Sequence, residues 1–152
     1  MKKIIFLIIV VNMGITGYAQ DKATTDFDES LAKELGADDY GMRKYVIAFL
    51  KKGPNRTNDS IKAVALQKGH MANIGRLAKE GKLAIAGPFL DNGELRGIYI
   101  FNVETIEEAK KLTESDPAIK AGSLVMELHP WYGSAALGLV NKYHAKVSKI
   151  KW

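Results

Sequence analysis

Residues 70–116 of this chain read HMANIGRLAKEGKLAIAGPFLDNGELRGIYIFNVETIEEAKKLTESD, and they carry the clearest signals of its fold. Their pattern predicts, in order, the end of one helix, two strands joined by an Asn-Gly turn, a second helix and an Asp-Pro turn. The stretch begins at His70 and ends at Asp116, and this order of elements allows the two side chains to meet. An imidazole held by a carboxylate keeps one tautomer and leaves its second nitrogen free to move a proton. We therefore take both as candidate catalytic residues.

The helix that contains His70 has a polar start and a continuous apolar side. Asp59 or Ser60 is a suitable N-cap, and Gly81 suits the left-handed position that closes a helix. At 100° per residue, the apolar side carries Ala63, Leu66, His70, Ile74, Leu77 and Ala78, and the other side carries Lys62, Lys68, Asn73, Arg76, Lys79 and Glu80. We expect His70 to be buried, although this spacing equally fits a core histidine bonded to a backbone carbonyl.

The remaining elements complete a β-α-β-β-α-β order. The Asn92-Gly93 pair is a strong signal for a tight two-residue hairpin turn. This order predicts an α+β, ferredoxin-like fold with helices on one side of an antiparallel sheet. The predicted strands are residues 43–51, 82–89, 95–103 and 124–129, and the second helix is residues 104–114.

Asp116 has a structural role even without chemistry. An aspartate directly before Pro117 is an ordinary N-cap for a short helical turn that runs to about Ala121. The two roles are compatible, because one carboxylate oxygen can cap the turn while the other accepts the imidazole N–H.

Both faces of the central strands are apolar. Tyr45, Ile47 and Phe49 alternate with Val46, Ala48 and Leu50, and Ile98 and Ile100 alternate with Tyr99 and Phe101. A sheet that has helices on one side only would not need two apolar faces. We therefore expect a homodimer in which two sheets pack face to face.

The N-terminus has the pattern of a bacterial export signal. Two lysines precede an uncharged stretch that ends in the small-residue pattern of a signal peptidase site, so residues 1–19 are predicted to be cleaved after Ala19. The apolar run is shorter than the 18 to 20 residues of a typical membrane span. These features predict a periplasmic or secreted protein without a stable membrane anchor after cleavage. Residues 20–41 are polar and acidic, and we interpret them as a flexible tether with one or two helical turns.

Composition narrows the classes of function. The chain has 152 residues and no cysteine, so a disulfide framework and a thiolate metal site are excluded. Its formal net charge is +5, but the basic residues are scattered up to residue 141, which argues against nucleic-acid binding. We expect one folded domain at residues 42–132 and a C-terminal extension at residues 133–152 in which Ala135, Leu137, Leu139 and Val140 indicate a helix. The lysines of this extension also suit weak attraction to an anionic envelope surface.

Four further residues are weaker candidates for substrate binding. Gly87 and Pro88 end a predicted strand, where a missing side chain would let the backbone approach a ligand, although a simple bend explains them equally well. His129 shares one face of the last predicted strand with Glu127, where a His-Glu metal pair is conceivable, and Trp131 and Tyr132 suit a planar ligand or simple aromatic packing. We expect no metal site, because few nitrogen ligands accompany His129, and no organic cofactor, because the chain has neither a phosphate loop nor a dinucleotide fingerprint.

Several of these segments together resemble the YCII-related family. They are the strand at residues 43–51, Gly69-His70-Met71-Ala72-Asn73-Ile74, the stretch from Glu80 to Pro88, and Glu114-Ser115-Asp116-Pro117. The resemblance spans residues 43 to about 131. It implies a dimeric α+β barrel, related in fold to muconolactone isomerases and small cofactor-free monooxygenases, with an active-site histidine and aspartate that carry over to His70 and Asp116. It also implies that some members act as lyases on ring compounds.

These observations lead to two hypotheses. The first is an exported enzyme without an organic cofactor, in which His70 and Asp116 perform general acid-base chemistry of lyase or isomerase type on a small cyclic or carbonyl compound of unknown identity. The alternative is a non-catalytic periplasmic module for ligand binding or assembly that uses the same cleft or the sheet-lined dimer.

Overall fold

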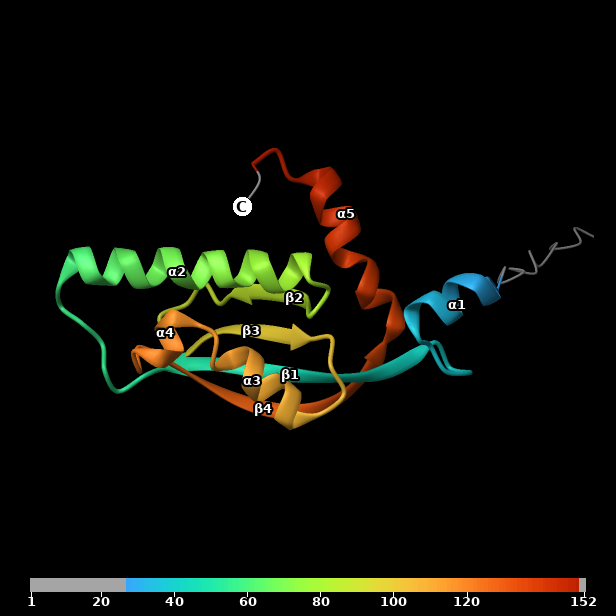
Figure 1. The fold of residues 1–152 in the computed structure, drawn as a ribbon, viewed down its shortest axis with the longest axis horizontal. Coiled ribbons are helices and arrows are strands. Elements are labelled where there is room, and N and C mark those ends of the chain that lie inside the picture. Colours follow the sequence, from blue (N-terminus) through green and yellow to red (C-terminus); the bar gives the residue numbers. More distant parts are fainter. Residues whose placement is uncertain (1–26, 151–152) are drawn as a thin grey trace, which may run out of the picture.

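A four-stranded antiparallel sheet forms the centre of the protein (Figure 1). The structure is a computed structural model that describes residues 27–150, so the predicted signal peptide and the first part of the predicted tether lie outside the described residues. The strand order is β2-β3-β1-β4, which is the ferredoxin-like arrangement and confirms the predicted fold class. The strands are β1 (Met42–Lys52), β2 (Leu83–Pro88), β3 (Leu95–Phe101) and β4 (Leu124–Ser134).

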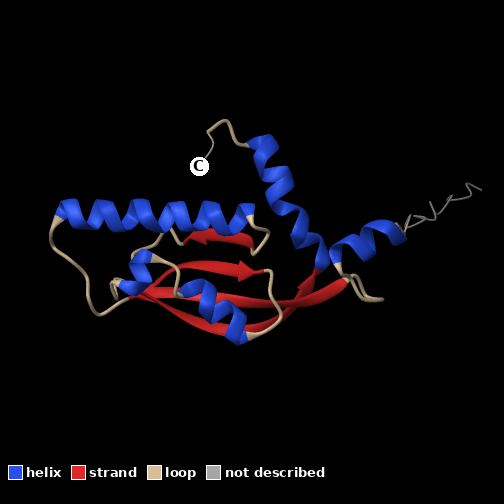
Figure 2. Ribbon diagram, in the orientation of Figure 1, coloured by secondary structure: helices blue, strands red, loops and turns tan. Residues whose placement is uncertain are grey.

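Helices cover one face of this sheet (Figure 2). Helices α2 (Ser60–Lys79) and α3 (Ile106–Thr113) pack on this face, and α4 (Pro117–Lys120) lies against α2. Helix α1 (Glu29–Leu35), the 3-10 turn η1 (Ala135–Leu139) and α5 (Val140–Val147) lie at the end of the sheet. The limits of α2 follow its capping residues: the Asp59 carboxylate accepts hydrogen bonds from the backbone N–H of Ile61 and Lys62, and Gly81 adopts a left-handed φ of 70° after the last turn.

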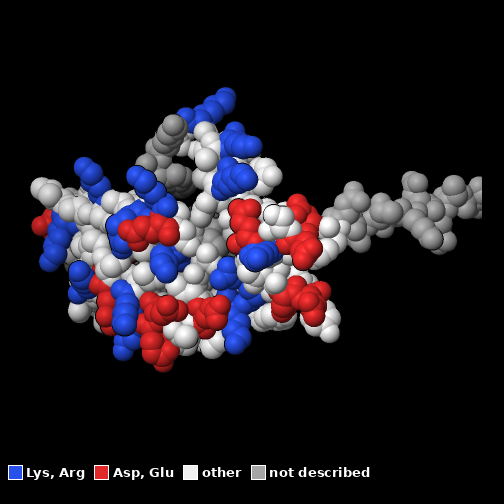
Figure 3. Space-filling view, turned by 45° about the vertical axis from the view of Figure 1, so that its right-hand side comes forward, with Lys and Arg blue, Asp and Glu red and all other residues white. Residues whose placement is uncertain are grey.

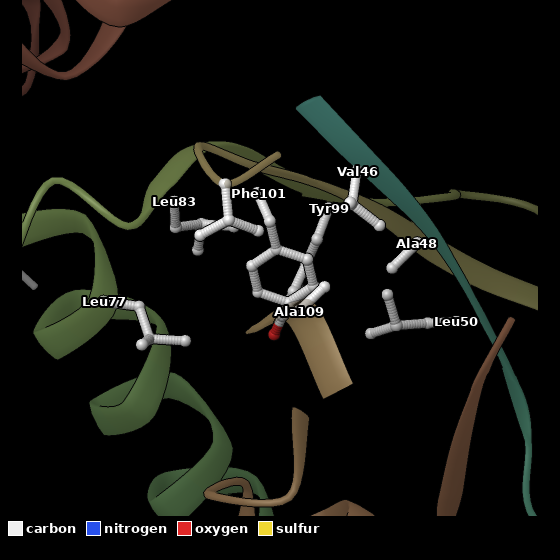
Figure 4. Packing of buried hydrophobic residues seen from close by; sticks show 9 residues of the cluster. Val46, Ala48, Leu50, Leu77, Leu83, Tyr99, Phe101 and Ala109 are labelled. Carbon is white, nitrogen blue, oxygen red and sulfur yellow. The ribbon is translucent and has the colours of Figure 1, made fainter. Parts of the chain in front are cut away.

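The main core lies between the sheet and helices α2 and α3. Figure 4 shows Leu77 of α2 opposite Val46 of β1, with the rings of Tyr99 and Phe101 of β3 between them. Successive strand residues point to opposite faces, so alternate residues of β1 and β3 enter this core. Tyr99 is therefore on the side of the sheet that α2 covers.

The hairpin between β2 and β3 differs from the prediction. Residues 89–94 form a six-residue connection, and neither Asn92 nor Gly93 has the positive φ that a tight two-residue turn requires. β2 ends at Pro88, the partner of Gly97, and the Phe89 N–H donates one further 3.0 Å hydrogen bond to the Arg96 carbonyl before the chain leaves β3. Asp91 then turns the chain by accepting a hydrogen bond from the Gly93 N–H.

β4 is longer than predicted, because it continues through Pro130 to Ser134. It pairs with β1 along its whole length, from Leu124 opposite Lys52 to Ser134 opposite Met42. β4 is an edge strand, where a proline can be accommodated with its missing N–H directed away from the ladder.

The second half of the predicted tether is ordered structure. The Asp28 side chain caps α1, and the Arg43 guanidinium donates a 3.0 Å hydrogen bond to the carbonyl of Leu35 at its end. Residues 28–41 are therefore attached to the sheet by specific bonds, which corrects the expectation of a flexible segment for this part. Figure 3 shows acidic side chains gathered around α1 and basic ones on the projecting α5.

The C-terminal extension folds back on the end of the sheet. Leu137 of η1 packs against the buried cluster of Tyr45, Ala84 and Ile100, and the Asn141 side chain donates a 2.7 Å hydrogen bond to the Leu83 carbonyl. From there α5 projects away from the sheet, beyond the end of α2 (Figure 1). Within residues 27–150, no helix is both long enough and apolar enough to span a membrane.

The face of the sheet opposite the helices is only partly covered. Ile47, Phe49 and Ile98 are half-buried on it, and Val125 is exposed. This apolar surface is the one that the sequence predicted to pack against a second sheet.

Candidate active site

His70 lies in the middle of α2 and is buried, with 7% of its surface exposed. Its imidazole is parallel to the ring of Tyr99, with the ring centroids 6.0 Å apart and the planes 20° apart. The burial expected from the apolar side of the helix is therefore confirmed.

Asp116 is the partner of His70 and is fully buried. Its Oδ2 atom lies 2.7 Å from Nδ1 of His70, and its Oδ1 atom accepts a 2.8 Å hydrogen bond from the N–H of Ala118 in α4. One oxygen caps the short helix and the other holds the imidazole, as the sequence predicted. Because a carboxylate accepts hydrogen bonds only, Nδ1 carries a proton and a neutral imidazole has its lone pair on Nε2.

Two opposing effects act on the Asp116 carboxyl group. Burial raises the pKa of this group, but the hydrogen bond and charge of His70 outweigh burial, with help from the Ala118 N–H and the Asn73 side chain. The pKa of Asp116 consequently lies below its ordinary value. The carboxylate form is the one that fixes the imidazole tautomer.

Tyr99 contacts the other nitrogen of His70. Its hydroxyl oxygen lies 3.3 Å from Nε2, within hydrogen-bonding distance. Burial raises the pKa of the Tyr99 hydroxyl, and the negative charge of Asp116 raises it further, so this group is a neutral hydrogen-bond donor. The sequence predicts Tyr99 only as a strand residue, because nothing in its spacing reveals that β3 lies beneath His70.

Asn73 was placed on the solvent side of α2 by the sequence, and this placement is wrong. Asn73 is buried, and its Nδ2 atom donates a 3.3 Å hydrogen bond to Oδ2 of Asp116. Its Oδ1 atom accepts hydrogen bonds from Arg76 (2.8 Å) and from the Ser115 hydroxyl (2.9 Å). Asn73 is three residues after His70, which places both on neighbouring parts of one helix face; that spacing was the available signal.

A large cavity open on one side adjoins this cluster. Its volume is about 1400 Å³, and both His70 and Tyr99 line it. The predicted ligand-binding residues Gly87 and Pro88 line the same cavity, and a Cβ atom added to Gly87 would meet no atom within 4 Å. Most of the other lining residues are aliphatic and come from α2, β2 and the C-terminal extension.

His129 and Trp131 do not belong to this site. On β4 they pair with Ile47 and Tyr45, whose side chains point away from the core that α2 covers. His129 instead binds Glu127 at 2.9 Å, and the Trp131 ring packs 5.9 Å from Tyr45. Within residues 27–150, no group of three or more His, Asp or Glu side chains is close enough together to hold a metal ion.

This arrangement suits proton transfer. Asp116 holds Nδ1–H, so Nε2 is the basic atom and lies beside the neutral hydroxyl of Tyr99 at the cavity wall. A neutral imidazole so oriented can accept a proton at Nε2, and the buried carboxylate stabilises the imidazolium that results.

The fold and this cluster define a small α+β protein of ferredoxin-like topology with a buried histidine–aspartate pair beside a cavity. Residues 44–132 match the sequence profile of the YCII-related domain, and the chain belongs to this family. Uncharacterized protein YjpA of Bacillus subtilis (strain 168) is 32% identical to it over 63 residues, which is 41% of this chain and 72% of that protein. Among solved structures, the 5-chloro-2-hydroxyhydroquinone dehydrochlorinase of Burkholderia phenoliruptrix AC1100 matches with a TM-score of 0.43 and 21% identity, over 57% of this chain and 92% of that one.

Proposed function

We propose that this protein is an enzyme that moves a proton on a small cyclic or carbonyl-bearing molecule, without an organic cofactor, in a reaction of lyase or isomerase type. His70 is the general base and then the general acid. The observation that carries this proposal is the 2.7 Å contact between His70 Nδ1 and Asp116 Oδ2, because it leaves Nε2 as the basic atom at the cavity wall.

The reaction begins with transfer of a proton from a substrate carbon to Nε2 of His70. The electron pair of the broken C–H bond forms a carbon–carbon double bond, with negative charge on a neighbouring carbonyl oxygen. In an isomerase reaction, Nε2–H returns the proton to a different carbon. In a lyase reaction, the double bond forms as a leaving group departs with its own electron pair, and His70 releases its proton to that group or to water.

Tyr99 assists by donating a hydrogen bond. In the free enzyme its hydroxyl donates to Nε2, and in the complex it donates instead to a substrate oxygen in the cavity that gains negative charge. Its raised pKa supports this role, because the hydroxyl keeps its proton at neutral pH.

The test uses deuterium oxide as the solvent. A panel of ring ketones, lactones and hydroxyquinones is incubated with the protein, and ¹H NMR follows both conversion and loss of substrate C–H signals by exchange. We expect His70→Gln to reduce the rate at least a hundredfold, because it removes the base.

His129→Gln is the matched control, since His129 lies outside the cavity on the other face of the sheet. Thermal unfolding shows whether each variant is folded. A folded His70→Gln protein with the rate of the wild type would refute the proposal.

The alternative function is ligand binding without chemistry. The mostly aliphatic lining of the cavity favours it, because such a lining binds apolar molecules whether or not they react. Tight binding of panel compounds without conversion or exchange would support this alternative.

Two further features of the working protein are part of the proposal. We propose a homodimer formed by the open face of the sheet, which the half-buried Ile47, Phe49 and Ile98 support. We also propose export with cleavage after Ala19, which the N-terminal sequence supports. N-terminal sequencing of the protein from a bacterial periplasm or culture medium tests the second point, because an N-terminus at Met1 would contradict it.

A further inference from the structure

We propose that the ligand of this cavity is an organic anion, an apolar molecule with a carboxylate or similar group that Arg56 and Arg96 bind. This inference rests on the proposed function, because it assigns a substrate class to the same cavity. Binding of such an anion is measurable without any turnover.

The first observation is the charge of the cavity wall. Arg56, Lys79 and Arg96 line it, and no aspartate or glutamate does. The described part of the chain has many acidic side chains, and an even distribution of charged residues over the surface would place some of them on a cavity wall that holds three basic residues. An aliphatic wall with a basic rim favours a ligand that is apolar over most of its surface and negative at one end.

The second observation is that the two arginines have no acidic partner. Arg56 makes no hydrogen bond and no ion pair within residues 27–150. The half-buried Arg96 has only weak contacts of 3.4 and 3.5 Å with the carbonyl oxygens of Asp91 and Gly93. The nearby Glu94 is paired with Lys52 at 3.2 Å and does not neutralise either arginine.

The third observation is that the arginines lie together. A smaller hollow of about 420 Å³ is lined by Lys52, Arg56, Asn92 and Arg96, so both arginines border this hollow and the main cavity. The guanidinium groups of the exposed Arg56 and the half-buried Arg96 have no acidic partner at this partly apolar wall, so they attract an anion, and their planar donor pairs match the two oxygens of a carboxylate.

The position of Arg96 relative to the catalytic pair gives an approximate ligand size. Arg96 is three residues before Tyr99 on β3, about 10 Å along a strand. In a regular strand this odd spacing would put the two side chains on opposite faces, but Arg96 is the unpaired residue of a register shift between Leu95 and Gly97, and both residues line the cavity. A molecule the size of a substituted ring can therefore place its anionic group near Arg96 and its reacting carbon near Nε2 of His70.

The experiment compares two fluorescent probes with the same aromatic skeleton. They are 1-anilinonaphthalene-8-sulfonate, which is an anion, and N-phenyl-1-naphthylamine, which is neutral. Titration of the full protein at low salt measures both dissociation constants. We expect the anion to bind about tenfold more tightly than the neutral probe, as for one charge-assisted hydrogen bond, and this advantage to shrink at 0.5 M salt.

The double variant Arg56→Gln and Arg96→Gln should lose this advantage and bind the neutral probe as the wild type does. The matched control is the double variant Lys68→Gln and Lys110→Gln, which removes two exposed charges that do not line the cavity. It should bind both probes as the wild type does. Equal affinities of the wild type for the two probes, or an unchanged anion affinity in the arginine variant, would overturn the inference.

The His70→Gln variant separates this inference from the proposed function. It should bind the anionic probe with wild-type affinity, because the anion site does not depend on the base. A His70→Gln variant that still turns over substrate would refute the catalytic proposal and leave the anion site standing. An arginine variant with normal anion binding would refute the anion site and leave the catalytic proposal standing.

Discussion

A Cβ atom on Gly69 would lie 2.9 Å from Cγ of Pro117, closer than real side-chain contacts allow. Gly69 precedes His70 and Pro117 follows Asp116, so this contact is the point at which α2 and α4 approach each other beside the His70–Asp116 pair. The missing side chain at Gly69 allows the 2.7 Å contact between the imidazole and the carboxylate.

The contact between Gly69 and Pro117 predicts that replacing glycine by alanine has different effects at two positions of α2. Gly75→Ala should stabilise the protein by about 0.5–1 kcal/mol, because alanine favours a helix and its Cβ meets nothing within 4 Å. Gly69→Ala should lose this gain, because the methyl group pushes Pro117 away. Urea unfolding measures both, and equal stabilisation would show that the contact is unimportant. NMR of the His70 ring should show a weaker Nδ1–H hydrogen bond in Gly69→Ala only.

The lowered pKa of Asp116 predicts a loss of stability in acid. A carboxyl group whose pKa is lower in the folded state contributes stability that is complete above its unfolded pKa of about 4 and is lost as the pH falls towards the folded value. Asp116→Asn removes this contribution, so the variant should be less stable at pH 7, by about 1–3 kcal/mol. Its free energy of unfolding should also change less between pH 5 and pH 2.

The control for this prediction is Asp39→Asn, which changes an exposed carboxylate. It should keep the pH dependence of the wild type.

The Asp116→Asn substitution also predicts a loss of activity. The new asparagine still caps α4 through its side-chain oxygen, so its amide NH₂ faces Nδ1 of His70 and forces the proton onto Nε2. Catalysis should then fall by a factor of about 10²–10⁴, and a fully active Asp116→Asn protein would contradict the role of the pair.

Tyr99→Phe tests the hydrogen-bond donor beside Nε2. Loss of the hydroxyl should reduce kcat by about 10- to 100-fold and change KM little, since the donor acts on charge that develops during the reaction. Tyr132→Phe is the control, because the exposed Tyr132 binds Asp38 far from the cavity. A change confined to KM would indicate that Tyr99 only binds substrate.

The open face of the sheet predicts a dimer that one charge disrupts. Ile98→Glu places a carboxylate in the middle of the half-buried apolar surface and should give a monomer, measured by sedimentation velocity. Ile61→Glu makes the same change at an 82% exposed position on α2, away from that face, and should leave the dimer intact. A dimeric Ile98→Glu protein would locate the interface elsewhere, and a monomeric wild type would refute the dimer.

Much of the fold could be predicted because its signals are local. The apolar side of α2, its aspartate cap and Gly81, and the alternation in β1 depend on residues a few positions apart. The same local chemistry predicted that Asp116 caps a turn. The end of β4 was predicted less well, because a strand continues for as long as its neighbour offers partners, and β1 offers them as far as Ser134.

Only some of the residues of the site could be predicted from the sequence. His70 and Asp116 could be paired through the resemblance to a family, but Tyr99 and Asn73 joined them only in three dimensions. His129 was a candidate from the sequence but does not line the cavity, because the register of β4 turns its side chain to the other face of the sheet.

The order and kind of the helices and strands follow from local signals, because caps and hydrophobic periodicity act within one or two turns of chain. Which polar groups share the buried space beside His70 follows only from the three-dimensional packing. That choice depends on strand register and on the close approach of α2 and α4 at Gly69, and both are set by packing between segments far apart in the chain.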